Sequence, residues 1–323
     1  MKNLFVIDRV ELKYFEFNKL VTNFWLIKEF LERGVDVYIT TIDKLSLDSG
    51  YAYAKCSKSY IKDNDIFYEK EFVKAKIEDF NLVMFRPDPP VDLDYINATY
   101  IFDFVDRNKT CIINDTSSIR DFNEKLHAVL FKEYMPKNIV TSAKDDIKQF
   151  LEENNEIILK PLNRCFGSGV MYLNKNDKNI TSIINTMTNN ETTLVMVQKY
   201  IPAGIYGDKR VLILDGEVMD ECIVKLPPDD DFKFNNHCDD YIKKAALNES
   251  EKEKFTKVAK KLKEMNIIMA GLDVIDEKII EVNVTSPCYF IKEINERFAA
   301  EIEHKIVDKI LETCSKKNPV SVL

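Results

Sequence analysis

Glycine is scarce in this chain, with only 8 among 323 residues. No G-x-G-x-x-G run follows the first hydrophobic segment, so a dinucleotide-binding Rossmann site is not supported. Glycine permits unusual backbone angles and close approach to a ligand, which makes the positions of the few glycines informative. Four of them, Gly167, Gly169, Gly207 and Gly271, lie next to charged segments that are candidates for a binding site.

Paired cysteines and long hydrophobic runs are also missing. The 7 cysteines are odd in number and include no C-x-x-C pair, which argues against a zinc knuckle and against a framework of disulfides. The first hydrophobic run, Leu4 to Ile7, is far too short for a signal peptide and meets Asp8 and Arg9 at once. We therefore expect a cytoplasmic protein with reduced cysteines and no membrane partner.

Neither sign of charge dominates the composition. The chain has 46 basic and 54 acidic side chains and a net charge of −8, which argues against a nucleic-acid partner. Its hydrophobic content of 45% and its charged content of 31% are typical of a soluble globular protein. A chain of this length can form two or three subdomains around separate cores.

Residues 1 to about 120 alternate between strand and helix patterns. Hydrophobic runs predict strands at 4–7, 35–40, 81–85 and 110–113, and one-sided hydrophobic spacing predicts helices at 19–33 and 92–107. Such alternation predicts a mostly parallel sheet in an α/β fold, with ligands bound beyond the carboxyl ends of the strands. Arg86 directly follows the third strand and is a candidate to hold a carboxylate, although an ordinary surface arginine fits equally well.

From residue 121 onward the pattern changes to that of an α+β fold. Helices are predicted at 124–136, 145–153, 248–265, 290–298 and 299–314, and strands at 157–161, 170–173, 193–201, 210–214 and 217–224. The polar segment 227–240 predicts a flexible loop that could act as a lid.

Two further segments carry candidate binding groups. The loop 163–169 could place backbone N–H groups against phosphate oxygens, with Lys160 adding a positive charge. A plain turn beside a solvated lysine is the alternative. Asp208 could accept hydrogen bonds from a ribose, and Arg210 would point at negative charge in the cleft, with exposed turn charges as the alternative for both.

The stretch 269–287 predicts an antiparallel hairpin, because two β-rich runs flank a three-residue loop at 276–278. With that loop, Asp273 lies opposite Glu281, and Asn283 points to the same face because strand side chains alternate. Two carboxylates and an amide oxygen suit a hard cation such as Mg²⁺. A half-exposed hairpin with a polar outer face is the alternative.

Eight runs between residues 84 and 287 carry a resemblance to a known family. They are MFRPDPP (84–90), ATYI (98–101), NEKL (123–126), IILKPL (157–162), GDKRVL (207–212), DGE (215–217), GLDVI (271–275) and EVNVTSP (281–287). In this order they resemble the prokaryotic type of glutathione synthetase, within the ATP-grasp superfamily.

The resemblance implies an ATP-grasp fold with three parts: an N-terminal substrate-binding domain (1–120), a small lid subdomain (121–200), and a central antiparallel-sheet subdomain with the metal site (201–323). It implies a ligase that uses ATP and Mg²⁺, with Mn²⁺ as an alternative metal, and joins a carboxylate to an amine through an acyl phosphate. The reaction implied is the synthesis of glutathione from γ-glutamylcysteine and glycine. Small-molecule substrates and a homo-oligomer are implied as partners.

The resemblance also assigns roles to single residues. ATP binding falls to Lys125, Lys160, Gly167, Gly169, Gln198, Lys199, Tyr200, Ile201 and Asp208. Metal binding falls to Asp273, Glu281 and Asn283, and stabilisation of the reacting carboxylate to Arg210. Substrate binding falls to Arg86, Lys233, Asn235, Ser286 and Pro287.

The chain departs from the family pattern in segments that contact substrate. The loop 163–169 has fewer glycines than is usual, segment 233–240 is acidic and has none, and Lys292 stands where the family tends to have arginine. Lysine lacks the bidentate fork of arginine. Two alternatives therefore stay open: a related ligase that joins a different acid and amine, and a nucleotide-binding regulatory protein without turnover.

Overall fold

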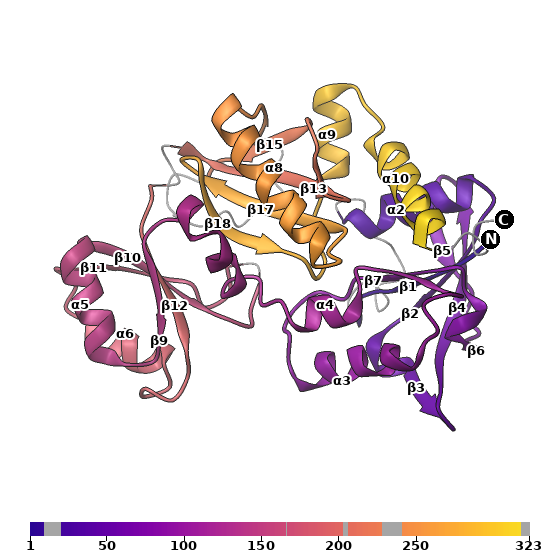
Figure 1. Cartoon of the computed structure of the whole chain (residues 1–323), viewed down its shortest axis with the longest axis horizontal. Coiled ribbons are helices and arrows are strands. Elements are labelled where there is room, and N and C mark those ends of the chain that lie inside the picture. Colours follow the sequence, from indigo (N-terminus) through magenta and orange to yellow (C-terminus); the bar gives the residue numbers. More distant parts are fainter. Residues whose placement is uncertain (10–20, 166, 203–205, 228–240, 318–323) are drawn as a thin grey trace.

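The computed structural model describes residues 1–9, 21–165, 167–202, 206–227 and 241–317. Its strands form three sheets of eight, four and six strands, which follow one another along the chain (Figure 1). The predicted α/β beginning and α+β continuation are both confirmed. Lys233 and Asn235, together with most of the predicted loop 227–240, lie outside the described residues.

The first sheet has a parallel centre covered by helices on both faces. Its parallel strands are β2 (Asp36–Thr40), β1 (Lys2–Val6), β7 (Leu82–Phe85) and β8 (Cys111–Ile113), in that order. Side chains of β1 alternate between two cores: Phe5 packs with helix α2 (Thr22–Glu32), and Leu4 packs with helix α3 (Leu93–Ile101). A short helix, α4 (Thr116–Arg120), follows β8.

An antiparallel extension of this sheet was not predicted from the sequence. Its strands are β3 (Leu45–Asp48), β4 (Tyr51–Lys62), β5 (Asp65–Tyr68) and β6 (Val73–Lys76). The long strand β4 pairs with all three others and with β2, where Tyr38 lies opposite Lys58. The helix predicted at 92–107 is also shorter, because α3 ends at Ile101 and continues only as a 3-10 turn, Phe102–Phe104.

The second sheet has its own small hydrophobic core. Its strands in spatial order are β11 (Met171–Asn174), β10 (Glu156–Pro161), β12 (Val195–Lys199) and β9 (Asn138–Thr141), all antiparallel. Helices α5 (Lys144–Asn154) and α6 (Ile180–Met187) pack against it through Ile147, Leu151 and Ile184. The helix predicted at 124–136 is instead a 3-10 helix, His127–Tyr134.

The third sheet carries most of the predicted site. Its strands are β13 (Asp208–Leu214), β14 (Glu217–Val218), β15 (Cys222–Lys225), β16 (Ile242–Ala245), β17 (Met269–Ile275) and β18 (Lys278–Asn283). Helix α8 (Glu249–Glu264) begins with a capping box formed by Asn248 and Glu251, and its apolar face is buried. Helices α9 (Ile291–Phe298) and α10 (Ile302–Lys317) close the described chain.

The first and third sheets are joined at the end of β8. The buried Asn114 side chain donates to Met269 O and Val284 O and accepts from Ile268 N and Met269 N, at 2.7 to 2.9 Å. One disulfide, Cys111–Cys314, also links β8 to α10. The expectation of reduced cysteines is therefore wrong for this pair, which lies 203 residues apart in the sequence and could not be foreseen from spacing.

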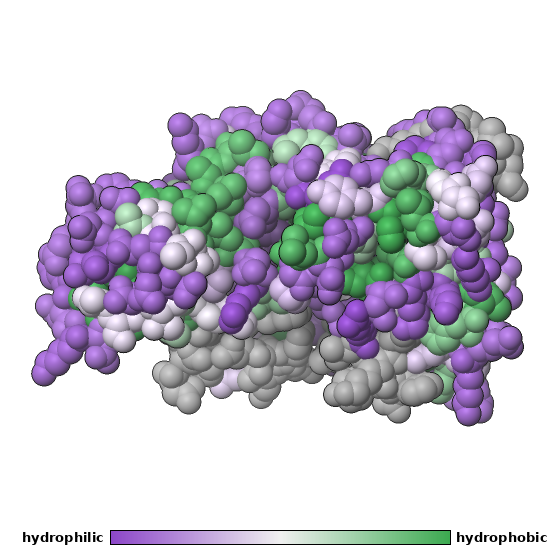
Figure 2. Space-filling view, turned by 90° about the horizontal axis from the view of Figure 1, so that it is seen from below, coloured by the Kyte–Doolittle hydropathy of each residue, from purple (hydrophilic) through white to green (hydrophobic). Residues whose placement is uncertain are grey.

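The face of the molecule seen in Figure 2 is predominantly polar. On the face shown in Figure 2, hydrophobic residues form separate patches between polar side chains. Large hydrophobic side chains that are exposed include Leu93, Phe104 and Leu130. Among the helices that the structure describes, none is long and apolar enough to span a bilayer. The homo-oligomer implied by the resemblance stays a prediction.

Candidate active site

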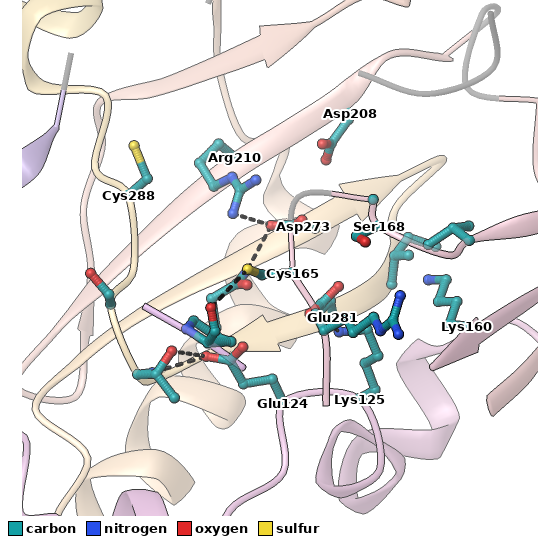
Figure 3. A pocket seen from close by; sticks show the side chains of 18 of the residues that line it. Glu124, Lys125, Lys160, Cys165, Ser168, Asp208, Arg210, Asp273, Glu281 and Cys288 are labelled. Atoms are coloured by element: carbon teal, nitrogen blue, oxygen red, sulfur yellow. Dashed lines mark hydrogen bonds and ion pairs between the residues drawn. The ribbon is translucent and has the colours of Figure 1, made fainter. Parts of the chain in front are cut away.

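A cavity of about 420 Å³ is lined by strands of the second and third sheets, together with the start of α2 and the segment that follows β7 of the first sheet (Figure 3). Fourteen of the residues predicted for the site line it: Arg86, Lys125, Lys160, Gly167, Gln198, Lys199, Tyr200, Ile201, Asp208, Arg210, Asp273, Glu281, Asn283 and Ser286. Side chains that are up to 200 residues apart in the chain thus meet in one place.

The hairpin β17–β18 has the predicted register. Asp273 pairs with Glu281, and Gly271 pairs with Asn283. The loop itself is shorter than predicted, because Ile275 pairs with Lys278 and leaves a two-residue turn. A bulge beside Asp273 adds the missing residue and restores the expected pairing.

Asp273 and Glu281 are each paired with a cation from another segment. Arg210 on β13 forms an ion pair with Asp273, and Lys125 Nζ lies 2.8 Å from Glu281 Oε1 (Figure 3). Burial raises the pKa of Asp273 to about 7, against the opposing effect of Arg210. Burial also acts to raise the pKa of Glu281, but Lys125 and Lys160 outweigh it and keep the pKa low.

The donor set of this hairpin fits a hard divalent cation. Burial penalises the charge of Asp273, which an ion at this place would relieve. Asn283 donates its amide N–H to Asp273 Oδ1 at 2.9 Å, so its amide would have to rotate to offer oxygen to the ion. In the described part of the chain, no cluster of three His, Cys, Asp or Glu side chains could hold a metal. The remaining ligands would therefore be water or substrate phosphates, as is usual for Mg²⁺.

Two lysines provide positive charge beside the hairpin. Lys125 Nζ donates to Arg164 O at 2.6 Å as well as to Glu281. Lys160 on β10 is 7% exposed, and its side-chain ammonium group forms no ion pair or hydrogen bond with the described residues. Burial lowers the pKa of Lys160 to about 8. A buried lysine without a fixed partner is suited to an anionic ligand.

The strand end 198–201 and Asp208 form another part of the wall. Gln198 Nε2 donates to Ile280 O at 3.3 Å, which holds β12 to the hairpin. Asp208 Oδ2 lies 3.3 Å from Lys225 Nζ, while the buried Asp208 Oδ1 has no hydrogen-bond partner among the described residues. A buried acceptor that is left unsatisfied is uncommon and indicates a missing ligand group.

At two positions of the loop 163–169 the backbone adopts a conformation that favours glycine. Gly167 and Gly169 have φ angles of +66° and +74°. At Gly169 an added Cβ would lie 3.0 Å from the side chain of Pro161, so a larger residue would not fit without movement. Gly167 is a lining residue of the cavity, whereas Gly169 is not.

Arg86 is not an ordinary surface arginine, because only 3% of it is exposed. Its Nε donates to Asn23 Oδ1 at 2.6 Å, and its Nη2 donates to Pro287 O at 3.0 Å. Ser286 lines the cavity beside it, whereas Pro287 contributes through its carbonyl group. Lys292, the departure noted in the sequence, lies on α9 with Glu296 at 4.0 Å and is not a lining residue.

No role for Glu124 is predicted from the sequence, although it lies within one of the runs that carry the family resemblance. Its buried Oε1 accepts from Val284 N, Thr285 N and Thr285 Oγ1 at 2.7 to 2.9 Å, and its carbonyl accepts from Val282 N at 3.1 Å. Glu124 therefore clamps the end of β18, and its neighbour Lys125 reaches the same strand. A carboxylate 160 residues away in sequence gives no local signal of such a role.

We expect Glu124→Ala to lower the free energy of unfolding by about 3 kcal/mol, because it leaves three buried donors without an acceptor. Urea unfolding measures this change. Glu133→Ala, at an exposed position in the following 3-10 helix, is the matched control and should change stability by less than about 0.5 kcal/mol. Equal effects of the two substitutions would contradict the clamp.

The architecture and this cavity define an ATP-grasp protein. D-cycloserine synthetase DcsG has the same fold, with a TM-score of 0.67, 13% identity, and coverage of 97% of this chain and 100% of that one. The ATP-grasp ligase PsnB, solved with a minimal precursor, Mg and ADP, has a TM-score of 0.59 and 12% identity, with coverage of 97% and 98%.

The family follows from sequence. The profile "Prokaryotic glutathione synthetase, N-terminal domain" matches residues 1–120, and "Prokaryotic glutathione synthetase, ATP-grasp domain" matches residues 124–299. A glutathione synthetase of Vibrio parahaemolyticus serotype O3:K6 (strain RIMD 2210633) is 36% identical over 291 residues, which cover 90% of this chain and 92% of that protein. The chain belongs to the prokaryotic glutathione synthetase family, as the resemblance implied, and is an ATP-dependent carboxylate–amine ligase that uses a divalent metal.

Proposed function

We propose that this ligase makes glutathione from γ-glutamylcysteine and glycine, with Mg²⁺ as its metal. One observation carries the proposal: the acids of the β17–β18 hairpin, two lysines and Arg210 converge on one cavity. Family membership supports the choice of substrates, because a glutathione synthetase matches this chain over 92% of its own length. Lys292 lies outside the cavity wall, so the departure at that position does not argue for different substrates.

At the nucleotide end, we assign phosphate binding to Lys125, Lys160 and the backbone N–H groups of the loop 163–169. Gly167 and Gly169 allow the turns of this loop. The strand end from Gln198 through Lys199 and Tyr200 to Ile201 would face the adenine. The unsatisfied Oδ1 of Asp208 would accept a hydrogen bond from the ribose. Asp273, Glu281 and Asn283 would hold Mg²⁺, which when bound neutralises phosphate charge.

In the first chemical step, the substrate carboxylate attacks the γ-phosphorus of ATP, giving an acyl phosphate and ADP. The amine then attacks the acyl carbon, and inorganic phosphate leaves. Arg210 lines the cavity and pairs with Asp273 through one Nη atom, so its guanidinium group can donate to the oxyanion of the tetrahedral intermediate. The cavity walls hold the two substrates together and exclude water from the acyl phosphate.

At the substrate end, Arg86 would hold a carboxylate, supported by Ser286 and the carbonyl of Pro287. Lys233 and Asn235 would cover the substrates from the segment that lies outside the described residues. The domain boundaries at 120 and 200, the homo-oligomer, the cytoplasmic location and the use of Mn²⁺ remain predictions.

The experiment is an assay of phosphate release with a panel of acids and amines. With γ-glutamylcysteine and glycine we expect phosphate and glutathione in equal amounts, and no phosphate when glycine is omitted. Turnover only with other pairs would replace this function by that of a related ligase. Tight ATP binding without turnover for any pair would contradict the proposal altogether.

The pKa of Lys160 gives a pH prediction for nucleotide binding. Bound phosphate favours the charged lysine, and in the free protein that charge is lost as the pH rises through about 8. We therefore expect ADP affinity to be constant below that pH and to fall by up to about tenfold per pH unit above it. Lys160→Arg keeps its charge and should remove the fall in calorimetric titrations between pH 7 and 9.5. A parallel fall in both proteins would contradict the assignment.

A further inference from the structure

One acid of the cavity has no part in the mechanism above. Asp88 follows Arg86 by two residues in the segment after β7, and it lines the cavity together with Thr22, Asn23 and Ser286. The side chain is partly buried, and it forms no ion pair with any residue that the structure describes. Its charge is therefore not neutralised by a fixed lysine, arginine or histidine.

The surroundings of Asp88 favour the arrival of a cation. Burial raises the pKa of Asp88, and the Ser286 hydroxyl, which interacts with the carboxyl group, acts in the opposite direction. The nearby Asp8 raises the pKa further, and Arg86 lowers it slightly. A carboxylate that is removed from water without an ion-pair partner is stabilised strongly by a ligand that brings a positive charge.

The neighbouring Arg86 is held in one orientation. Asn23 Oδ1 and Pro287 O accept from its Nε and Nη2, and Ser286 Oγ lies 3.5 Å from Nη2. Ser286 thus contacts both charged side chains, Arg86 and Asp88. This wall of the cavity presents a positive and a negative group side by side, a pattern that is complementary to the ammonium and carboxylate of one amino acid.

The proposed acyl donor has such a group. In γ-glutamylcysteine the peptide bond uses the side-chain carboxyl of the glutamyl residue, so the α-ammonium and α-carboxylate remain on one carbon. They lie at the far end from the cysteinyl carboxylate that reacts. An α-linked glutamyl peptide does not carry both groups on one carbon.

We propose that Asp88 accepts the α-ammonium of the acyl donor while Arg86 holds the adjacent α-carboxylate, which makes Asp88 a specificity-determining residue for γ-linked donors. This inference rests on the proposed function. It adds the chemical feature by which the donor is selected, and it assigns that selection to the segment after β7 rather than to the segment 228–240.

The test compares two donors and two proteins. Glutaryl-cysteine differs from γ-glutamylcysteine only in lacking the α-ammonium. The wild type should use γ-glutamylcysteine with a kcat/KM about 10- to 100-fold higher, the range for losing a hydrogen bond to a charged group. In Asp88→Asn this preference should shrink to about threefold or less, because only the reaction of γ-glutamylcysteine slows. Competitive inhibition by glutaryl-cysteine gives its affinity independently of its turnover.

Controls separate the possible failures. Asp94→Asn changes an exposed acid on α3 and should leave the preference for γ-glutamylcysteine unchanged. If Asp88→Asn slows both donors equally, or if the wild type does not distinguish them, the role of Asp88 is overturned while glutathione synthesis stands. If the wild type makes no glutathione at all, the proposed function itself fails. Unchanged inhibition by glutaryl-cysteine in Asp88→Asn shows that the variant is folded.

Discussion

Asp273→Asn and Glu281→Gln should each reduce metal-dependent turnover by at least about a hundredfold. Even the loss of a residue that only hydrogen-bonds to a metal ligand lowers metal affinity or activity by about 10- to 100-fold. The two side chains face each other on one hairpin and are the only carboxylates assigned to the ion. Each substitution keeps the shape of the side chain and removes one negative oxygen. The measurement is the rate of phosphate release as a function of Mg²⁺ concentration.

A control for this prediction lies on the same hairpin. Asp276 is exposed in the turn with a φ of 50°, a conformation that asparagine also adopts, so Asp276→Asn should leave turnover unchanged. Thermal unfolding should show that all three variants fold. Full activity in both Asp273→Asn and Glu281→Gln would remove the metal assignment.

Arg210→Lys should lower kcat by about 100- to 1,000-fold, the usual effect of losing one donor to a developing oxyanion. Lysine keeps the charge of Arg210 but not its planar fork, which pairs with Asp273 in the present structure. Because the loss concerns the transition state, the KM for ATP should change little. Steady-state kinetics at saturating glycine and γ-glutamylcysteine would measure both constants.

The neighbouring residue provides the comparison. Lys209 points to the other face of β13, where its Nζ lies 2.7 Å from both carboxyl oxygens of Glu251. Lys209→Arg alters a partly buried cation on the same strand without touching the cavity, so its kcat should stay within about threefold of the wild type. A kcat for Arg210→Lys in that same range would contradict the role of Arg210.

The hairpin shows what local sequence rules can establish. Alternation of side chains along two strands, together with a turn at residue 276, was sufficient to place Asp273 opposite Glu281. The details of the turn were wrong, because a two-residue turn with a bulge and a three-residue loop give the same register beyond the bulge. A pattern of period two fixes the face of a strand but not the way in which the chain reverses.

Other features depend on partners that are distant in the sequence. The ion pair between Arg210 and Asp273, the clamp of Glu124 on Thr285, and the Cys111–Cys314 disulfide each join separate segments. The antiparallel strands between residues 45 and 76 were missed, because buried positions of the long strand β4 carry small or polar side chains such as Ala54, Ser57 and Ser59, which form no hydrophobic run. Family resemblance supplied residues of the cavity, but it did not indicate which of them pair when no ligand is bound.

The most direct test of the central claim is the position of the metal. Crystals of the protein grown with ADP and Mn²⁺ should give an anomalous scattering peak in the cavity. We predict that the peak marks an ion coordinated by carboxylate oxygens of Asp273 and Glu281 and by a phosphate oxygen of the nucleotide. Asn283 should be the remaining protein ligand. A metal bound away from the β17–β18 hairpin, or a nucleotide bound far from Lys125 and Lys160, would contradict it.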